Sequence, residues 1–193
     1  MAACPDCLFD LVLDDQDHST DWLRRGDVRA AVSAFGGSVQ GCDMRPLGSL
    51  RYIATASPDF MQRWFSEGVT PETLARAPAM TFNAKDGLQN RWISQVFGVD
   101  LSPPTHFLGS SQAFLDGAMA GLGWGLNPLA LARDALENGR LVEMVPDTPV
   151  DTPLYWHWSR SVGAAMAPVT RSVCEEARRV LLPVSMPPEP PLA

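Results

Sequence analysis

The first part of the chain contains three short apolar segments, and a segment with helix signals lies between the first two. Residues 8–13, 28–34 and 50–56 are short and mainly apolar, which is typical of β-strands, and residues 28–34 have the pattern of a strand buried on both faces. Between the first two segments, Asp17 is a candidate N-cap for a helix that ends at Gly26. The pattern therefore predicts the order strand, helix, strand, strand.

Proline and acidic residues mark two further helix starts. Ser57-Pro58-Asp59 and Thr70-Pro71-Glu72 each supply a hydroxyl cap, a proline at the first helical position and a carboxylate near the positive end of the helix dipole. The first of these two helices is expected to end near Gly68.

The second half of the chain repeats the alternation of strands and helices. Strands are predicted at residues 80–82, 105–108, 141–145 and 154–158, with a brief strand after the glycines at 121–125, and helices at residues 86–97, 111–120, 129–138 and 168–182. Residues 183–193 hold five prolines and are predicted to be disordered.

This alternation predicts an α/β fold with mainly parallel strands and helices on both faces of the sheet. A break near Ala79 and a return near Ser159 suggest two lobes. Lobe I is expected to comprise residues 1–78 and 159–182, and lobe II residues 79–158. Ligands of such folds bind at the carboxyl ends of strands, beside helix N-termini, and often between lobes.

Composition and charge narrow the function classes. Apolar residues make up 46% of the chain, which is enough for a core, and 15 basic against 22 acidic residues give a net charge of −7. An acidic surface repels phosphate backbones, so the chain itself is a poor candidate for binding nucleic acid. It has neither an apolar run long enough to span a membrane nor the basic start of a signal peptide, so we expect a cytoplasmic protein.

No pattern of catalytic or metal-binding residues is found. Cys4-Pro-Asp-Cys7 lacks a second cysteine pair at zinc spacing and precedes a strand-like segment, so reduced cysteines are expected. Gly121, Gly123 and Gly125 have the spacing G-x-G-x-G and follow a helix, which is the wrong context for dinucleotide binding. The sequence therefore predicts no enzyme, no cofactor and no metal site.

The most unusual polar segment is Asp14-Asp15-Gln16-Asp17-His18. Three carboxylates lie within four residues between a predicted strand and a helix, and only Asp17 is explained as a cap. Because such carboxylates repel each other, a guanidinium or ammonium group of a small ligand is a candidate partner. A solvated acidic loop explains the segment equally well.

Polar residues also follow other predicted strands. Ser110 and Ser111 stand at a helix N-terminus, where hydroxyl and N–H groups can bind a carboxylate or simply cap the helix. Asn83 and Lys85 lie at another strand-to-helix junction, and Asn127 before Pro128 reads more readily as a cap than as a ligand contact. Together these residues predict a cleft for a small zwitterion, whose cationic end the carboxylates would hold.

Several segments resemble a known family in chain order. Residues 22–32 (WLRRGDVRAAV), 46–58 (PLGSLRYIATASP) and 120–128 (AGLGWGLNP) resemble the effector-binding domain of LysR-type transcriptional regulators. Residues 12–18, 39–42 and 82–89 are similar to the arginine- and lysine-responsive subfamily, which is ArgP/LysG-like and also known as chromosome replication initiation inhibitor. The likeness covers roughly residues 9–182.

The resemblance implies two Rossmann-like lobes that resemble type 2 periplasmic binding proteins, with a basic amino acid, lysine or arginine, between them. It implies a homodimer or homotetramer whose arrangement changes when the effector binds, and effector contacts near residues 14–18, Asn83 and 110–111. It also implies that DNA is bound only through a winged helix-turn-helix that this sequence does not include, and that the first lobe is truncated at its N-terminal strand. The alternative is a structural dimerisation domain that has lost ligand binding.

Overall fold

The chain folds into two compact units, and a computed structural model describes residues 7–183. Within that range unit 1 comprises residues 7–11, 16–50 and 152–183, and unit 2 comprises residues 12–15 and 51–151. The units divide the chain at residues 50/51 and 151/152, inside two long strands, whereas the sequence pattern placed the lobe boundaries near residues 79 and 159. The proline-rich tail expected from residue 183 lies outside the described residues, apart from Pro183 itself.

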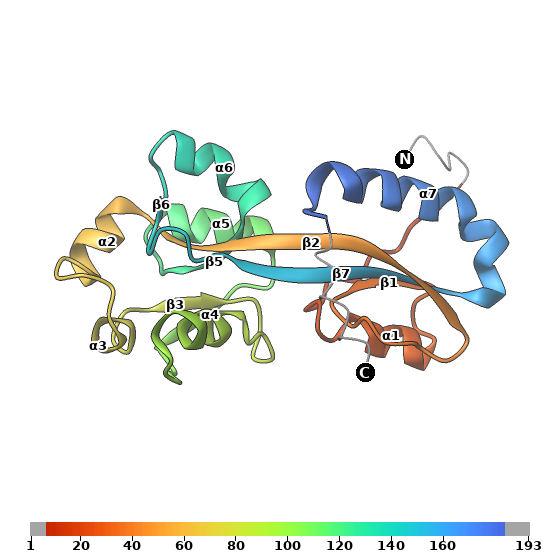
Figure 1. Cartoon of the computed structure of the whole chain (residues 1–193), viewed down its shortest axis with the longest axis horizontal. Helices are drawn as coiled ribbons and strands as arrows, with labels where there is room; N and C mark the ends of the chain where they lie inside the picture. The colour runs from red at the N-terminus through yellow and green to blue at the C-terminus, as the bar shows by residue number, and fades with distance from the viewer. Residues whose placement is uncertain (1–6, 184–193) are drawn as a thin grey trace, which may run out of the picture. The chain divides into compact units, whose positions relative to one another are not determined.

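Unit 1 is built from strands, two α-helices and a short 3-10 helix (Figure 1). Its elements are α1 (Ser19–Arg25), β1 (Ala30–Ser33), the first part of β2 (Cys42–Ala56), most of β7 (Val150–Ser159), η1 (Arg160–Val162) and α7 (Gly163–Val180). β1 is antiparallel to β7, with Ala30 opposite Trp158 and Ser33 opposite Tyr155. α7 is fixed to this sheet by a hydrogen bond of 3.0 Å from the Trp156 indole N–H to the Thr170 hydroxyl.

The helix α1 ends as predicted but begins later than predicted. Gly26 closes it in the left-handed conformation, with φ at 78°. Its N-cap is His18 and not Asp17, so the expectation that Asp17 is the N-cap of this helix is wrong. The helix begins at Ser19, two residues after Asp17.

The strand predicted at residues 8–13 is wrong. The segment is irregular, and Leu8, Leu11 and Leu13 are at least three-quarters exposed. An apolar segment becomes a strand only where its backbone N–H and C=O groups meet a neighbouring strand. No strand pairing within residues 7–183 includes it.

Two other elements of unit 1 begin earlier in the chain than predicted. β2 begins at Cys42 instead of near residue 50, and its Ser49 exchanges backbone hydrogen bonds of 2.8 and 3.0 Å with Leu182. α7 begins at Gly163 and contains Pro168, which the sequence pattern took as its start. A proline inside a helix removes one backbone hydrogen bond and its ring crowds the carbonyl four residues earlier, so the sequence pattern favours a start at Pro168 although the helix extends five residues before it.

Unit 2 contains the remaining helices and strands (Figure 1). After β2 the chain forms α2 (Pro58–Trp64), α3 (Pro71–Leu74), β3 (Ala79–Thr81), α4 (Leu88–Phe97), β4 (Thr105–Phe107), α5 (Ser111–Met119), β5 (Gly125–Pro128), α6 (Leu129–Glu137) and β6 (Val142–Glu143). Both proline-marked helix starts are confirmed, because Ser57 caps α2 and Thr70 forms a capping box with Thr73 on α3.

The strands of unit 2 combine parallel and antiparallel neighbours. β3 is parallel to β4, and Trp124, just before β5, forms a parallel bridge with Ala79. β2 is antiparallel to both β5 and β6. The expectation of mainly parallel strands therefore holds only around β3, because β2 runs in the direction opposite to the strands it joins.

Helices cover both faces of the β3–β4–β5 strands, as predicted for an α/β fold. Adjacent residues of β3 belong to different cores, since side chains alternate across a strand: Ala79 packs with Trp92 of α4 and Met80 with Phe114 of α5. Loops follow the carboxyl ends of β3 and β4 between these two helical layers. Asn83, Ser110 and Ser111 lie in or next to these loops, and Asn127 lies near the end of β5.

Candidate functional site

Three polar segments of unit 2 lie at one edge of its parallel strands. β3 lies between β4 and the start of β5, and all three strands run in the same direction. Asn83 follows β3, Ser110 and Ser111 follow β4, and Asn127 is near the end of β5. These residues, far apart in the sequence, therefore lie along one edge of the parallel strands. That they contact a ligand stays a prediction.

The Asn83 side chain shapes the loop after β3. Its Oδ1 accepts hydrogen bonds from the backbone N–H of Lys85 at 2.8 Å and of Asp86 at 3.2 Å. The Asp86 carboxylate in turn accepts from the backbone N–H of Phe82 at 3.0 Å and of Leu88 at 2.9 Å. Asn83 therefore has a local structural role, which leaves its amide N–H₂ for other contacts. The Lys85 side chain is exposed.

Ser110 and Ser111 occupy the first positions of α5. The Ser110 hydroxyl accepts the backbone N–H of Ala113 at 3.4 Å, so Ser110 is the N-cap, as one of the two interpretations predicted. Ser111 is exposed, and its hydroxyl has no hydrogen-bond partner among residues 7–183. The junction can therefore offer one hydroxyl and the positive end of the helix dipole to an anionic group.

Asn127 is fully buried, and the interpretation of it as a helix cap is wrong. It belongs to β5, and the N-cap of α6 is Pro128. Its amide N–H donates to the Thr55 hydroxyl at 3.0 Å, while its Oδ1 meets no donor among the described residues. An unsatisfied buried carbonyl oxygen costs about 1–3 kcal/mol, so this atom is poised to accept a hydrogen bond from a ligand or a water molecule.

The acidic segment is divided between the units. In unit 2, the Asp14 carboxylate accepts the backbone N–H of Asp15 at 2.8 Å, and the Asp15 side chain is only 7% exposed. In unit 1, Asp17 is exposed and His18 is half-buried. Because burying a carboxylate is costly unless it is paired or hydrogen-bonded, the burial of Asp15 does not fit a merely solvated acidic loop. Asp14, Asp15 and Asp17 each take part in further noncovalent interactions.

The backbone of the acidic segment is held firmly in unit 1. The Gln16 carbonyl accepts the Ser33 hydroxyl at 2.8 Å and the backbone N–H of Ala34 at 2.9 Å. His18 Nδ1 lies 3.9 Å from a carboxylate oxygen of Asp21, the acid of the first turn of α1. These contacts hold Gln16 against the end of β1 just before the chain enters α1.

Thr55 and Asp86 support the candidate residues through hydrogen bonds. Thr55 holds the Asn127 amide, and nothing in its strand sequence distinguishes it from a core threonine. Asp86 ties both ends of the loop after β3, and its position two residues before α4 is a signal typical of helix starts.

Neither a metal centre nor a membrane span is found in the described chain. Residues 7–183 contain no group of three His, Cys, Asp or Glu side chains that could hold a metal ion. No helix in that range is both long and apolar enough to cross a bilayer.

Two compact units of helices and strands, one of them with polar residues at the ends of its parallel strands, are typical of the α/β class of ligand-binding modules. The chain belongs to the family of LysR substrate-binding domains, since the model of that family matches residues 1–181. The fold prediction is confirmed by the C-terminal domains of a LysR family protein from Agrobacterium tumefaciens, which superpose with a TM-score of 0.89 at 52% identity and cover 95% of this chain and 88% of that one.

Among curated proteins, the chain is similar to regulators named ArgP and LysG. The chain is 41% identical over 180 residues to the transcriptional regulator ArgP of Pseudomonas fluorescens Pf-5, and 39% identical over 168 residues to LysG of Mycobacterium tuberculosis. It covers 60% and 55% of their lengths, and they cover 93% and 87% of it. Both relatives are named as HTH-type transcriptional regulators.

One solved relative carries a ligand. Full-length LysG from Corynebacterium glutamicum, described with bound effector Arg, superposes with a TM-score of 0.81 at 32% identity. The match covers 94% of this chain and 62% of LysG. The resemblance to ArgP and LysG inferred from the sequence is thus confirmed, and the chain is an effector-binding domain of that kind.

Proposed function

We propose that this chain senses a basic amino acid, arginine or lysine, on behalf of a LysR-type transcriptional regulator. The observation that carries the proposal is the LysG structure with bound effector Arg, whose fold this chain shares over 94% of its length. DNA binding by the whole protein, action in the cytoplasm, and assembly into a homodimer or homotetramer are parts of the same proposal.

The chemistry of the candidate residues suits such a ligand. Asp14, Asp15 and Asp17 supply carboxylates for a guanidinium or ammonium group, and charge-assisted hydrogen bonds of this type are the strongest that side chains form. The free hydroxyl of Ser111 and the start of α5 suit the α-carboxylate of the amino acid, as does the Lys85 ammonium.

The amide side chains of Asn83 and Asn127 can form directional hydrogen bonds with the ligand. The unsatisfied Oδ1 of Asn127 suits an N–H donor of the ligand, and the amide N–H₂ of Asn83 suits an acceptor. His18 lies next to Asp17 and would limit how close a cation approaches when its imidazole is protonated.

Calorimetric titration with arginine, lysine and citrulline tests the proposal. Citrulline has nearly the shape of arginine without the charge, so we expect arginine or lysine to bind and citrulline to bind at least about tenfold more weakly. Asp17→Asn should weaken binding of the basic amino acid without loss of folding, because Asp17 is exposed. Asp100→Asn, which changes an exposed acid of unit 2 that is not a candidate ligand contact, is the matched control.

Two results would count against the proposal. One is the absence of heat with either basic amino acid at millimolar concentration while the chain is folded by circular dichroism. The other is an equal affinity for arginine and citrulline, because the carboxylates would then contribute nothing to recognition.

A second candidate function is a dimerisation domain without ligand binding. It is favoured by the exposed apolar side chains Leu8, Leu11 and Leu13, since exposed apolar clusters often mark surfaces of association. Sedimentation that shows a stable dimer with no response to arginine or lysine would support this function instead.

A further inference from the structure

Unit 1 contains a pocket along one face of α7, and none of the candidate ligand-binding residues lines it. Its volume is about 290 Å³. β2 contributes Arg45 and β7 contributes Trp158, while α7 contributes Thr170, Arg171, Cys174 and Arg178. All of these residues belong to unit 1, so the pocket is complete within one compact unit.

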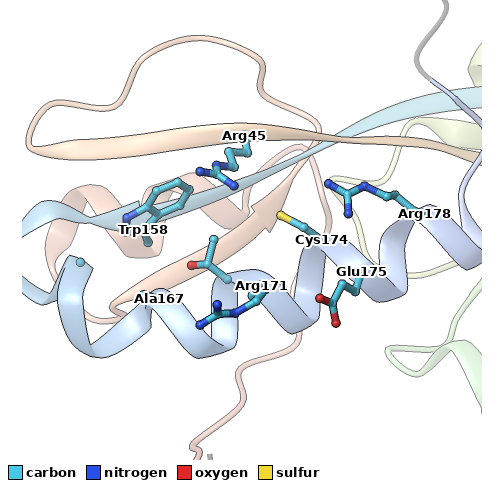
Figure 2. A pocket seen from close by; sticks show the side chains of 9 residues that line it. Arg45, Trp158, Ala167, Arg171, Cys174, Glu175 and Arg178 are labelled. Atoms are coloured by element: carbon cyan, nitrogen blue, oxygen red, sulfur yellow. The ribbon is translucent and has the colours of Figure 1, made fainter. Parts of the chain in front are cut away.

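The pocket has a buried floor and charged walls. Thr170 and Cys174 are less than one-tenth exposed, and the Thr170 hydroxyl is fixed by the Trp156 indole. Positions 170, 174 and 178 are four residues apart and therefore lie on one stripe of the helix. Figure 2 shows the guanidinium groups of Arg45 and Arg178 on either side of the Cys174 sulfur, with the Trp158 ring beside Arg45.

The charge of the lining is opposite to that of the chain. The lining contains three arginines, Arg45, Arg171 and Arg178, and one acidic residue, Glu175, so its side chains carry a net charge of +2 in a chain of net charge −7. None of the three guanidinium groups has a hydrogen bond or ion pair to any residue between 7 and 183. Elsewhere in unit 1, by contrast, Arg160 binds Asp43 at 2.8 Å. The donors around the pocket are therefore available to a ligand.

We propose that this pocket binds a small organic anion that carries a carboxylate or phosphate group and a flat apolar part. Guanidinium groups bind such oxyanions through paired N–H donors, and Arg45 and Arg178 approach from two different elements. The face of the Trp158 indole suits the apolar part of the ligand. The volume lies at the lower limit of small-molecule sites, about 300–1,000 Å³, which favours a small molecule over a protein segment.

This site is separate from the proposed site for a basic amino acid. Its charge repels a guanidinium or ammonium group, so the two sites take ligands of opposite charge. An anion bound here would give the regulator a second input that does not compete with arginine or lysine.

Calorimetry on the whole chain with inorganic phosphate, phenyl phosphate, benzoate and phenol tests the proposal. We expect phenyl phosphate or benzoate to bind, phenol not to bind, and phosphate to bind more weakly than phenyl phosphate, because both the oxyanion and the ring contribute. Comparison of phenyl phosphate with benzoate shows whether the pocket prefers a phosphate or a carboxylate group. Binding should weaken with added salt, since the guanidinium groups are exposed.

The double variant Arg45→Gln/Arg178→Gln should bind the aromatic anion about tenfold more weakly. Arg63→Gln/Arg133→Gln removes the same charge from unit 2 and should leave the affinity unchanged. Trp158→Leu should reduce the preference for phenyl phosphate over phosphate. Thermal unfolding establishes that each variant is folded.

Absence of binding by both aromatic anions at millimolar concentration would overturn the proposal. An equal loss in the two double variants would also overturn it, because the effect would then come from net charge alone. Arginine should bind to the Arg45→Gln/Arg178→Gln variant with the same affinity as to the unchanged chain. Failure of the proposed arginine or lysine site can therefore be told apart from failure of the proposed anion pocket.

Discussion

Arg51 and Asp151 form a bidentate ion pair across 100 residues of sequence. Arg51 Nε donates to Asp151 Oδ1 at 2.8 Å and Nη2 donates to Oδ2 at 2.7 Å. Arg51 lies on β2 and Asp151 on β7, the two strands that contribute residues to both units, and both residues belong to unit 2. The hydrogen bonds to Asp151 raise the pKa of the Arg51 guanidinium above its ordinary value.

We expect the Arg51–Asp151 pair to contribute modestly to stability. Both side chains are more than one-third exposed, and exposed pairs of good geometry couple by about 0.2–1 kcal/mol. A double-mutant cycle with Arg51→Gln and Asp151→Asn, measured by urea unfolding, should give a coupling energy in this range that shrinks with added salt. A coupling energy of zero at low salt would contradict the bidentate geometry.

Local signals in the sequence predicted the starts of α2 and α3. Ser57 and Thr70 act as caps through their own hydroxyl groups, and the proline that follows each fixes the backbone of the first turn. These features depend on a few consecutive residues, so no knowledge of distant contacts was needed.

Features that depend on distant residues could not be predicted. Residues 8–13 have the composition of a strand but meet no partner strand within residues 7–183. β2 begins eight residues early because its first half joins distant segments of unit 1. Asn127 was taken as a cap from its neighbour Pro128, whereas its contact is Thr55, 72 residues away. The pocket along α7 is lined by residues of β2, β7 and α7. The spacing of its arginines along the sequence does not indicate that they line one pocket.

The core of unit 2 should be sensitive to Trp92. This indole is fully buried, donates to the carbonyl and hydroxyl of Thr148 at 3.1 Å, and packs against Trp124 with ring centroids 5.4 Å apart. Trp92→Ala should lower the free energy of unfolding by about 3–5 kcal/mol, as the loss of a buried aromatic leaves a cavity. Urea unfolding followed by far-UV circular dichroism measures it.

A matched control distinguishes the loss of a buried side chain from the loss of an exposed apolar side chain. Leu131→Ala removes a side chain that is 45% exposed on α6 and should change the free energy of unfolding by less than about 0.5 kcal/mol. Equal effects of the two substitutions would contradict the packing of Trp92.

Stability should fall in mildly acidic solution because of His157. The side chain is fully buried, its Nε2 lies 2.8 Å from the Phe35 carbonyl, and its Nδ1 has no hydrogen-bond partner among residues 7–183. Burial lowers the pKa of His157 below its ordinary value of 6.5; the hydrogen bond to Phe35 opposes this, and the nearby Arg24 charge adds to it.

The lowered pKa fixes the direction of the pH dependence. Between the lowered pKa and 6.5 the unfolded chain binds a proton that the folded chain does not, so the stabilising contribution is complete above pH 6.5 and is lost as the pH falls. Urea unfolding across this range should show a pH dependence that His157→Gln reduces and His106→Gln, at an exposed position, does not. An unchanged slope in His157→Gln would contradict the assignment.

Gly48 should tolerate substitution worse than another glycine with positive φ. Its φ is 140°, and a Cβ there would lie 2.6 Å from the Leu182 carbonyl oxygen and 2.7 Å from Leu181 Cβ. Gly68 has φ at 103° with open space around it, so Gly68→Ala meets only backbone strain, of about 1–2 kcal/mol. Gly48→Ala adds a clash with backbone and should cost about 1–3 kcal/mol more in the free energy of unfolding.

Hydrogen exchange locates the damage in Gly48→Ala. The Leu182 N–H donates to the Ser49 carbonyl at 3.0 Å, and this bond ties the end of the described chain to β2. Because a Cβ at position 48 would push Leu182 away, the Leu182 amide should lose protection in Gly48→Ala and keep it in Gly68→Ala. Equal protection in both variants would mean that the segment after α7 is not held against β2, and that Gly48 is needed for its backbone conformation alone.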